Sequence, residues 1–175
     1  MQILTDELAK PIKLVIFDVD GVFTDGKLYF NNQGEAIKAF NSLDGIGIKM
    51  LMDSGIEVAI ITGRTSKIMT TRATELGITH LYQGNSNKLA AFTHCLEKLK
   101  LTPEVCAYMG DDVSDLPLMQ QVHLSIAPPN AVAEVKEQAN WITTAAGGNG
   151  AVRETADAIL KAQNKWQQAI KAYGN

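Results

Sequence analysis

Apolar positions in this 175-residue chain form short continuous runs separated by longer amphipathic stretches. Continuous runs without polar alternation are typical of strands that helices cover on both faces. Such runs lie at 14–17, 58–61 and 105–109, with weaker candidates at 79–82, 123–127 and 141–143. Helical patterns lie between them, at about 44–53, 65–76, 86–100, 112–121, 130–138 and 150–163. This alternation predicts an α/β fold, a Rossmann-like three-layer sandwich with a parallel central sheet.

One segment departs from the alternation, directly after the first strand. Residues 27–30 and 36–40 flank the sequence Asn31-Asn32-Gln33-Gly34, which predicts a β-hairpin with a glycine-containing turn. We therefore expect a single domain over 1–175, with a hairpin insertion at about 26–40. A polar C-terminal tail at about 163–175 completes the chain.

Composition excludes several classes of partner. A net charge of −3 gives no reason to expect nucleic acid or an anionic membrane surface. No apolar run approaches the roughly 20 residues of a membrane span, and the first ten residues lack the pattern of a signal peptide. We expect Cys95 and Cys106 to be buried reduced thiols and the protein to be cytoplasmic.

Acids and cations cluster where the predicted strands end. The first strand runs into Asp18 and Asp20, and a buried carboxylate pair is costly without a cation or a reacting group. Ligands of parallel α/β sheets bind at the carboxyl ends of the strands. The other strand ends carry Thr62-Gly63-Arg64, Lys88 at the start of a helix, and Gly110-Asp111-Asp112-Val113-Ser114-Asp115.

These groups are the parts that phosphoryl transfer through an aspartyl intermediate requires. Asp18 can attack phosphorus, and Asp20 can protonate the leaving alkoxide and then deprotonate water. Lys88 would balance negative charge, and Thr62 would hold phosphoryl oxygens.

Oxygen ligands without nearby His or Cys favour Mg²⁺ as the cofactor. We expect Asp18 and Asp111 to bind the ion directly and Asp20 to contribute its carbonyl oxygen. Asp112 and Asp115 would complete or orient this metal site.

The strand-end residues occur as four motifs, at residues 18–20, 62–64, 88 and 110–115. Over residues 14–115, these motifs and their order resemble those of the haloacid dehalogenase superfamily. Within that family the acid at the Asp20 position implies a phosphatase or phosphomutase. Four further stretches resemble the branch that hydrolyses 3-deoxy-D-manno-octulosonate 8-phosphate in lipopolysaccharide biosynthesis. They are residues 20–26, 41–45, 78–84 and 147–154.

The narrower resemblance implies an assembly and a set of substrate contacts. It implies a hairpin in place of a cap domain and a Mg²⁺-dependent homotetramer whose neighbouring subunit closes each site. It implies that substrate contacts Asp20 and Lys88 together with Asn41, Ser42, Leu43, Asp44, Gly45, Arg64 and Arg72. Another interpretation of 41–45 is a plain helix start capped by Asp44.

Three other functions are compatible with parts of this pattern. The nearest is the same chemistry on a nine-carbon acid such as an acylneuraminate 9-phosphate, or on another sugar phosphate. A receiver-like phosphoacceptor also uses acids, Thr, Lys and Mg²⁺, but its phosphorylated Asp follows the third strand rather than the first. The third possibility is a non-catalytic subunit. The presence of a suitable residue at every catalytic position argues against it.

Overall fold

A computed structural model describes residues 4–173. Six parallel strands form one sheet in the order β5-β4-β1-β6-β7-β8. Their bounds are β1 Leu14–Phe17, β4 Glu57–Ile61, β5 His80–Tyr82, β6 Cys106–Met109, β7 Leu124–Ala127 and β8 Trp141–Ile142. The predicted parallel α/β sandwich is therefore confirmed.

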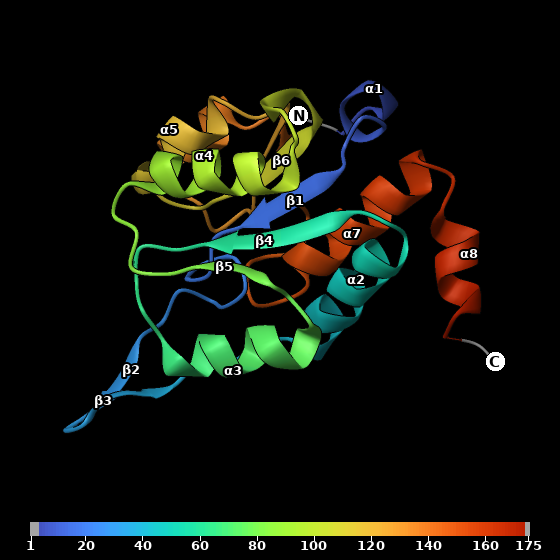
Figure 1. Ribbon diagram of the computed structural model, residues 1–175. Helices are drawn as coiled ribbons and strands as arrows, with labels where there is room; N and C mark the ends of the chain where they lie inside the picture. Colours follow the sequence, from blue (N-terminus) through green and yellow to red (C-terminus); the bar gives the residue numbers. More distant parts are fainter. Residues whose placement is uncertain (1–3, 174–175) are drawn as a thin grey trace.

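Helices cover both faces of this sheet (Figure 1). One face packs against α2 Ser42–Asp53, α3 Lys67–Leu76 and α7 Ala151–Ala162. The other packs against α4 Lys88–Leu99, α5 Leu116–Met119 and α6 Ala133–Gln138. Alternate residues of β1 divide between the two cores, with Val15 and Phe17 on one side and Leu14 and Ile16 on the other. This double burial explains why the strand has no polar position.

Two short 3₁₀ helices, Pro103–Val105 and Val113–Asp115, flank β6. The second replaces the start of the helix that we expected at 112–121, because Asp112 and Asp115 form a capping box around this turn. The peripheral helices are α1 Asp6–Ala9 and α8 Trp166–Lys171. Among the described residues, no helix combines the length and the apolar character that crossing a bilayer requires.

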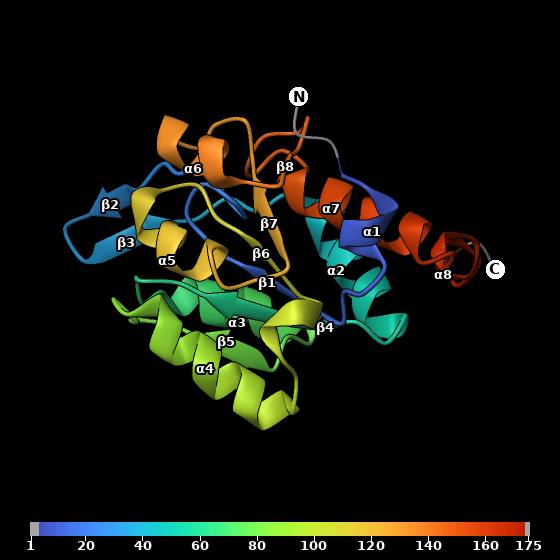
Figure 2. The ribbon, with the colours of Figure 1, turned by 90° about the horizontal axis from the view of Figure 1, so that it is seen from above.

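A second, two-stranded sheet stands apart from the main one. It consists of β2 Tyr29–Asn31 and β3 Gly34–Ile37, paired antiparallel with a register shift between Tyr29 and Phe30. The hairpin projects from the edge where the main strands end, and both views place it at the opposite end of the molecule from α8 (Figures 1 and 2). Much of its apolar surface is solvent-exposed: Leu28, Tyr29, Phe30 and Ile37.

Candidate active site

The register of the sheet brings three strand ends to one level. Phe17 at the end of β1 pairs with Ile60 of β4 and with Met109 of β6. The residues that follow these strands are therefore neighbours at the carboxyl edge of the sheet. They line a cavity of about 460 Å³, whose walls include Asp18, Asp20, Thr62, Arg64, Lys88 and Asp111.

Lys88 is the buried cation of this cavity. It is the first residue of α4, and its ammonium lies 3.1 Å from Asp18 Oδ2 and 2.5 Å from Asp115 Oδ1. Burial opposes the charge, but the two carboxylates outweigh it and raise the pKa of Lys88 above its usual value. A charged lysine therefore faces the proposed nucleophile. The N-cap of α4 is Asn87, whose side chain accepts from the Ala90 N–H.

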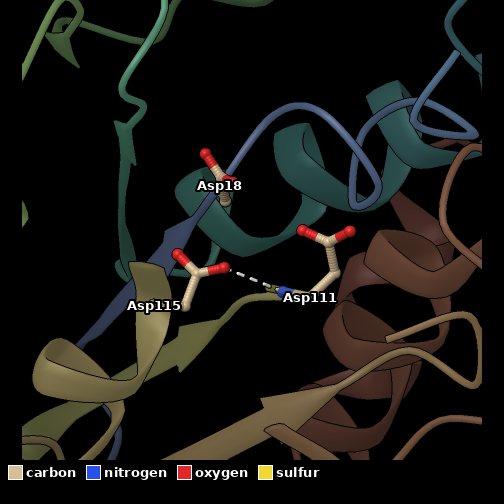
Figure 3. Close-up of side chains that lie close together, drawn as sticks. All are labelled: Asp18, Asp111 and Asp115. Atoms are coloured by element: carbon tan, nitrogen blue, oxygen red, sulfur yellow. Dashed lines mark hydrogen bonds between the residues drawn. The ribbon is translucent and has the colours of Figure 1, made fainter. Parts of the chain in front are cut away.

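Three carboxylates lie close together at this site (Figure 3), and two of them contact Lys88. Oxygens of Asp18, Asp111 and Asp115 all lie within 4.8 Å of one another. Burial, followed by the charge of Asp115, raises the pKa of Asp18 to about 6 and the pKa of Asp111 to about 7. Three acids this close repel one another, and one ammonium does not neutralise them.

Asp115 is the member of this cluster whose two carboxylate oxygens both accept hydrogen bonds from the protein. It is fully buried. Its Oδ1 accepts from Lys88 and, over 2.5 Å, from the Tyr108 hydroxyl. Its Oδ2 accepts the backbone N–H groups of Asp111 and Asp112. Asp115 therefore positions Lys88 and the loop that follows β6, and both of its oxygens are occupied.

Asp18 and Asp111 fit a divalent cation better. Asp18 Oδ1 is buried, and it has no hydrogen-bond partner among the described residues. The Asp111 carboxylate occupies space that only glycine leaves open, since a Cβ on Gly21 would come within 1.9 Å of Asp111 Oδ2. Hard oxygen donors and excess negative charge are what Mg²⁺ prefers. The residues present therefore fit a magnesium ion between Asp18 and Asp111.

Asp20 reaches the same cavity from the turn after β1. The Lys38 ammonium contacts its Oδ1, and Arg64 Nε lies 3.4 Å from its Oδ2. Arg64 itself is partly exposed and lies over the Phe30 ring at 5.6 Å. The structure thus brings together every residue that was predicted for catalysis and metal binding.

The remaining predicted substrate contacts lie elsewhere in this chain. Ser42, Leu43, Gly45 and Arg72 line a second hollow of about 270 Å³ between α2 and α3. Arg72 pairs there with Glu75 at 2.9 Å and lies over the Phe40 ring. A single subunit therefore does not bring these groups to the acids.

The interpretation that Asp44 caps the helix that begins at 41–45, which is α2, is wrong. The N-cap is Asn41, whose side chain accepts the Leu43 N–H. Asp44 is buried and instead accepts the Arg153 N–H at the start of α7. It caps a different helix, because Gly150 at the N-cap of α7 has no side chain to do so.

Sequence reasoning missed three residues that support the site. Lys38 contacts Asp20, Tyr108 bonds to Asp115, and Asn130 links two loops behind Gly21. Lys38 and Tyr108 lie in predicted strands, and Asn130 lies at the start of a predicted helix, so none of the three lay in a predicted strand end. The one available signal was a lysine within the apolar 36–40 stretch of the predicted hairpin.

Known proteins resemble this chain over most of its length. The family model of haloacid dehalogenase-like hydrolases matches residues 66–154. The chain is 53% identical to 3-deoxy-D-manno-octulosonate 8-phosphate phosphatase KdsC of Escherichia coli K12 over 161 residues, which are 92% of this chain and 86% of that protein.

Solved structures give the same result. The 3-deoxy-D-manno-octulosonate 8-phosphate phosphatase from Yersinia pestis superposes with a TM-score of 0.90 at 51% identity, covering 93% of this chain and 89% of that one. The enzyme of that name from Moraxella catarrhalis, in complex with a magnesium ion, a phosphate ion and KDO, superposes with a TM-score of 0.92. Its identity is 43%, over 96% of this chain and 97% of that one.

Proposed function

Because this chain belongs to the haloacid dehalogenase-like hydrolases, in the family of 3-deoxy-D-manno-octulosonate 8-phosphate phosphatases, we propose that it hydrolyses that sugar phosphate. The products are the free eight-carbon sugar acid and inorganic phosphate, and the pathway served is lipopolysaccharide biosynthesis. The observation that carries the proposal is the buried Asp18 carboxylate, aligned by Lys88 and facing Asp111 at the strand ends.

Asp18 is the nucleophile and Asp20 is the acid and base of the reaction. An Asp18 oxygen forms a bond to phosphorus while the bond from phosphorus to the sugar oxygen breaks, and Asp20 gives its proton to that oxygen. Asp20 then takes a proton from a water molecule as the water oxygen attacks the aspartyl-phosphate. Phosphate leaves, and both carboxyl groups return to their starting state.

Other residues hold the charges of this reaction. Asp18, Asp111 and the Asp20 carbonyl oxygen would bind Mg²⁺, which offsets the charge of the nucleophile and the phosphate ester. Lys88 contributes a fixed positive charge beside the nucleophile. Thr62, which is buried at the end of β4, binds phosphoryl oxygens together with nearby backbone N–H groups.

A homotetramer would complete the site. The hairpin is too small to exclude water from the cavity, and its Leu28, Tyr29, Phe30 and Ile37 leave an apolar surface exposed. In the assembly, a neighbouring subunit would supply Arg72 and residues 41–43 and 45 beside it to the substrate, whereas Asp44 stays buried under α7. Sedimentation at micromolar concentration tests this proposal, and a monomer would contradict it.

Mixed assemblies test whether Arg72 acts on a neighbour's substrate. An Asp18→Asn subunit has no nucleophile but keeps Arg72, whereas an Arg72→Ala subunit has the reverse defect. Co-assembled subunits should recover activity that neither variant shows alone, because an intact nucleophile then faces an intact arginine wherever unlike subunits are neighbours. If the mixture is no more active than the two parents, Arg72 acts within its own chain or not at all.

We assign the protein to the cytoplasm. The support for this compartment is that Cys95 and Cys106 are both buried free thiols.

The deciding experiment measures phosphate release with Mg²⁺ or with EDTA. The substrates are 3-deoxy-D-manno-octulosonate 8-phosphate, N-acetylneuraminate 9-phosphate and p-nitrophenyl phosphate. We expect Mg²⁺-dependent turnover with a strong preference for the first. Equal rates on all three would keep the phosphatase chemistry and remove the assignment to lipopolysaccharide synthesis. A preference for N-acetylneuraminate 9-phosphate would show that the protein is a phosphatase of nine-carbon sugar acids instead.

A further inference from the structure

The root of the hairpin carries a buried lysine that lies against the acid–base residue. Lys38 directly follows β3, and its side chain is 3% exposed. Its ammonium contacts Asp20 Oδ1 and lies 3.4 Å from Glu35 Oε1. The other oxygen of Glu35 accepts the Ser66 hydroxyl, and Ser66 is the N-cap of α3. A chain of polar contacts therefore runs from α3 through the hairpin to Asp20.

A lysine this deeply buried is unfavourable unless carboxylates surround it. Asp20 and Glu35 meet that need, so the arrangement holds the ammonium in one place. Lys38 does not line the catalytic cavity. It lines a separate hollow with Phe40 and Arg72, on the α3 side. The ammonium therefore approaches Asp20 from the α3 side rather than from the catalytic cavity.

We propose that Lys38 is a positioning residue for Asp20, an inference that rests on the proposed function. The carboxyl group of Asp20 has two oxygens, and only one can carry the proton that reaches the leaving group. Lys38 holds Oδ1 and thereby turns Oδ2 toward the cavity, where Arg64, a partly exposed side chain, is its neighbour. Glu35 and Ser66 hold Lys38 in turn, so the hairpin determines the orientation of the Asp20 carboxyl group.

The effect of Lys38 should depend on the leaving group. A sugar alkoxide leaves only when an acid protonates it, whereas p-nitrophenolate leaves without a proton. In Lys38→Met we expect kcat/KM for 3-deoxy-D-manno-octulosonate 8-phosphate to fall by about 10²-fold, because this parameter reports on the transfer to Asp18 and not on the later hydrolysis of the aspartyl-phosphate, which both substrates share. On p-nitrophenyl phosphate we expect a loss in kcat/KM of less than about threefold. A merely structural defect would lower both rates alike, and that result would overturn the proposal.

A double-mutant cycle with Asp20→Asn tests whether Lys38 acts through Asp20. If it does, adding Lys38→Met to Asp20→Asn should change the residual rate by less than about twofold. If Lys38 acts on the substrate directly, the second substitution should cost the full factor again, which would also overturn the proposal. The wild-type rate on the sugar phosphate reports on the proposed function by itself, so the two proposals fail separately.

Two further variants guard against a folding defect. Glu35→Gln keeps the lysine but loosens its ammonium, and we expect a loss of about fivefold with the same bias toward the sugar phosphate. Lys27→Met is the matched control, because Lys27 lies on the same segment but pairs with Asp25 at the surface. It should leave both rates unchanged. An unbiased loss in Glu35→Gln, or a biased loss in Lys27→Met, would contradict the role of Lys38.

Discussion

Gly147 lies so close to Gly21 that a Cβ atom on Gly147 would fall 1.8 Å from the Gly21 carbonyl oxygen. Asn130 fixes this approach, since its amide donates to Gly21 O over 2.9 Å and accepts from Gly147 N over 2.7 Å. The turn that carries Asp18 and Asp20 is therefore braced from behind by the glycine-rich loop. This loop supports the catalytic turn rather than lining the cavity.

Gly147→Ala should disturb both folding and catalysis. The added methyl group meets backbone rather than a movable side chain, so the turn around Gly21 must shift. We expect the free energy of unfolding to fall by about 1–3 kcal/mol and kcat to fall at least tenfold. Urea unfolding and phosphate release measure the two effects. Gly55→Ala is the control, because Gly55 has φ +77° in open space and should cost about 1 kcal/mol without changing kcat.

Asp18→Asn should abolish turnover and stabilise the metal-free protein. Burial raises the pKa of Asp18 to about 6, so the ionised carboxylate is less favourable in the folded state than in the unfolded chain. Removing that charge should raise the free energy of unfolding at pH 7.5 by about 1–3 kcal/mol in EDTA. A variant that is inactive and less stable would contradict the electrostatic account.

Magnesium should reverse this order of stabilities. Wild type offers Asp18 and Asp111 to the ion, and binding to the folded state raises Tm by mass action. We expect a clear rise in Tm with Mg²⁺ for wild type and a much smaller one for Asp18→Asn or Asp111→Asn. Glu97→Gln, an exposed change on α4, serves as the control and should respond as wild type does.

The strand ends are the part of the site that sequence could predict. Continuous apolar runs locate buried parallel strands, and such strands place their following residues at one edge of the sheet. Asp18, Thr62 and Asp111 therefore needed no knowledge of distant contacts. Lys88 could be added because a helix that follows a strand must begin near the same edge.

Contacts between segments that are far apart in the sequence could not be predicted from it. Asp44 caps a helix more than a hundred residues away, and Lys38 finds Asp20 only because the hairpin folds back on the turn. Neither contact has a periodic signature, since each depends on how two elements pack. Arg72 lies in a hollow away from the acids, and resemblance alone could not indicate from which subunit it acts.

Tyr108→Phe tests the support beneath Lys88. The Tyr108 hydroxyl is buried and neutral, because burial raises its pKa well above 10, and it donates to Asp115 Oδ1 over 2.5 Å. We expect the free energy of unfolding to fall by about 1–3 kcal/mol and kcat to decrease by a factor of less than about ten. Tyr173→Phe, at a residue that is 46% exposed, should stay within about 0.5 kcal/mol. Equal effects of the two substitutions would show that the bond to Asp115 contributes nothing.

Asp44 should make the stability of the fold depend on pH. It lies buried between α2 and α7, and burial raises its pKa to about 6 although the Arg153 N–H and nearby positive charges oppose the shift. Between pH 4 and 6 the folded state then holds a proton that the unfolded chain, with a pKa near 3.8, has released. The free energy of unfolding contributed by this group therefore falls as pH rises through that window and is constant above about pH 7.

Asp44→Asn isolates this contribution, because the amide oxygen still accepts the Arg153 N–H but carries no charge. The stability of the variant relative to wild type should increase by about 2 kcal/mol between pH 4.5 and pH 7.5. Urea unfolding at fixed protein concentration in EDTA measures the difference at each pH. Asp53→Asn, an exposed carboxylate-to-amide change at the other end of α2, is the control substitution. If the Asp44→Asn curve runs parallel to the wild-type curve, Asp44 ionises in the fold without penalty, and the buried helix cap does not set the pH response.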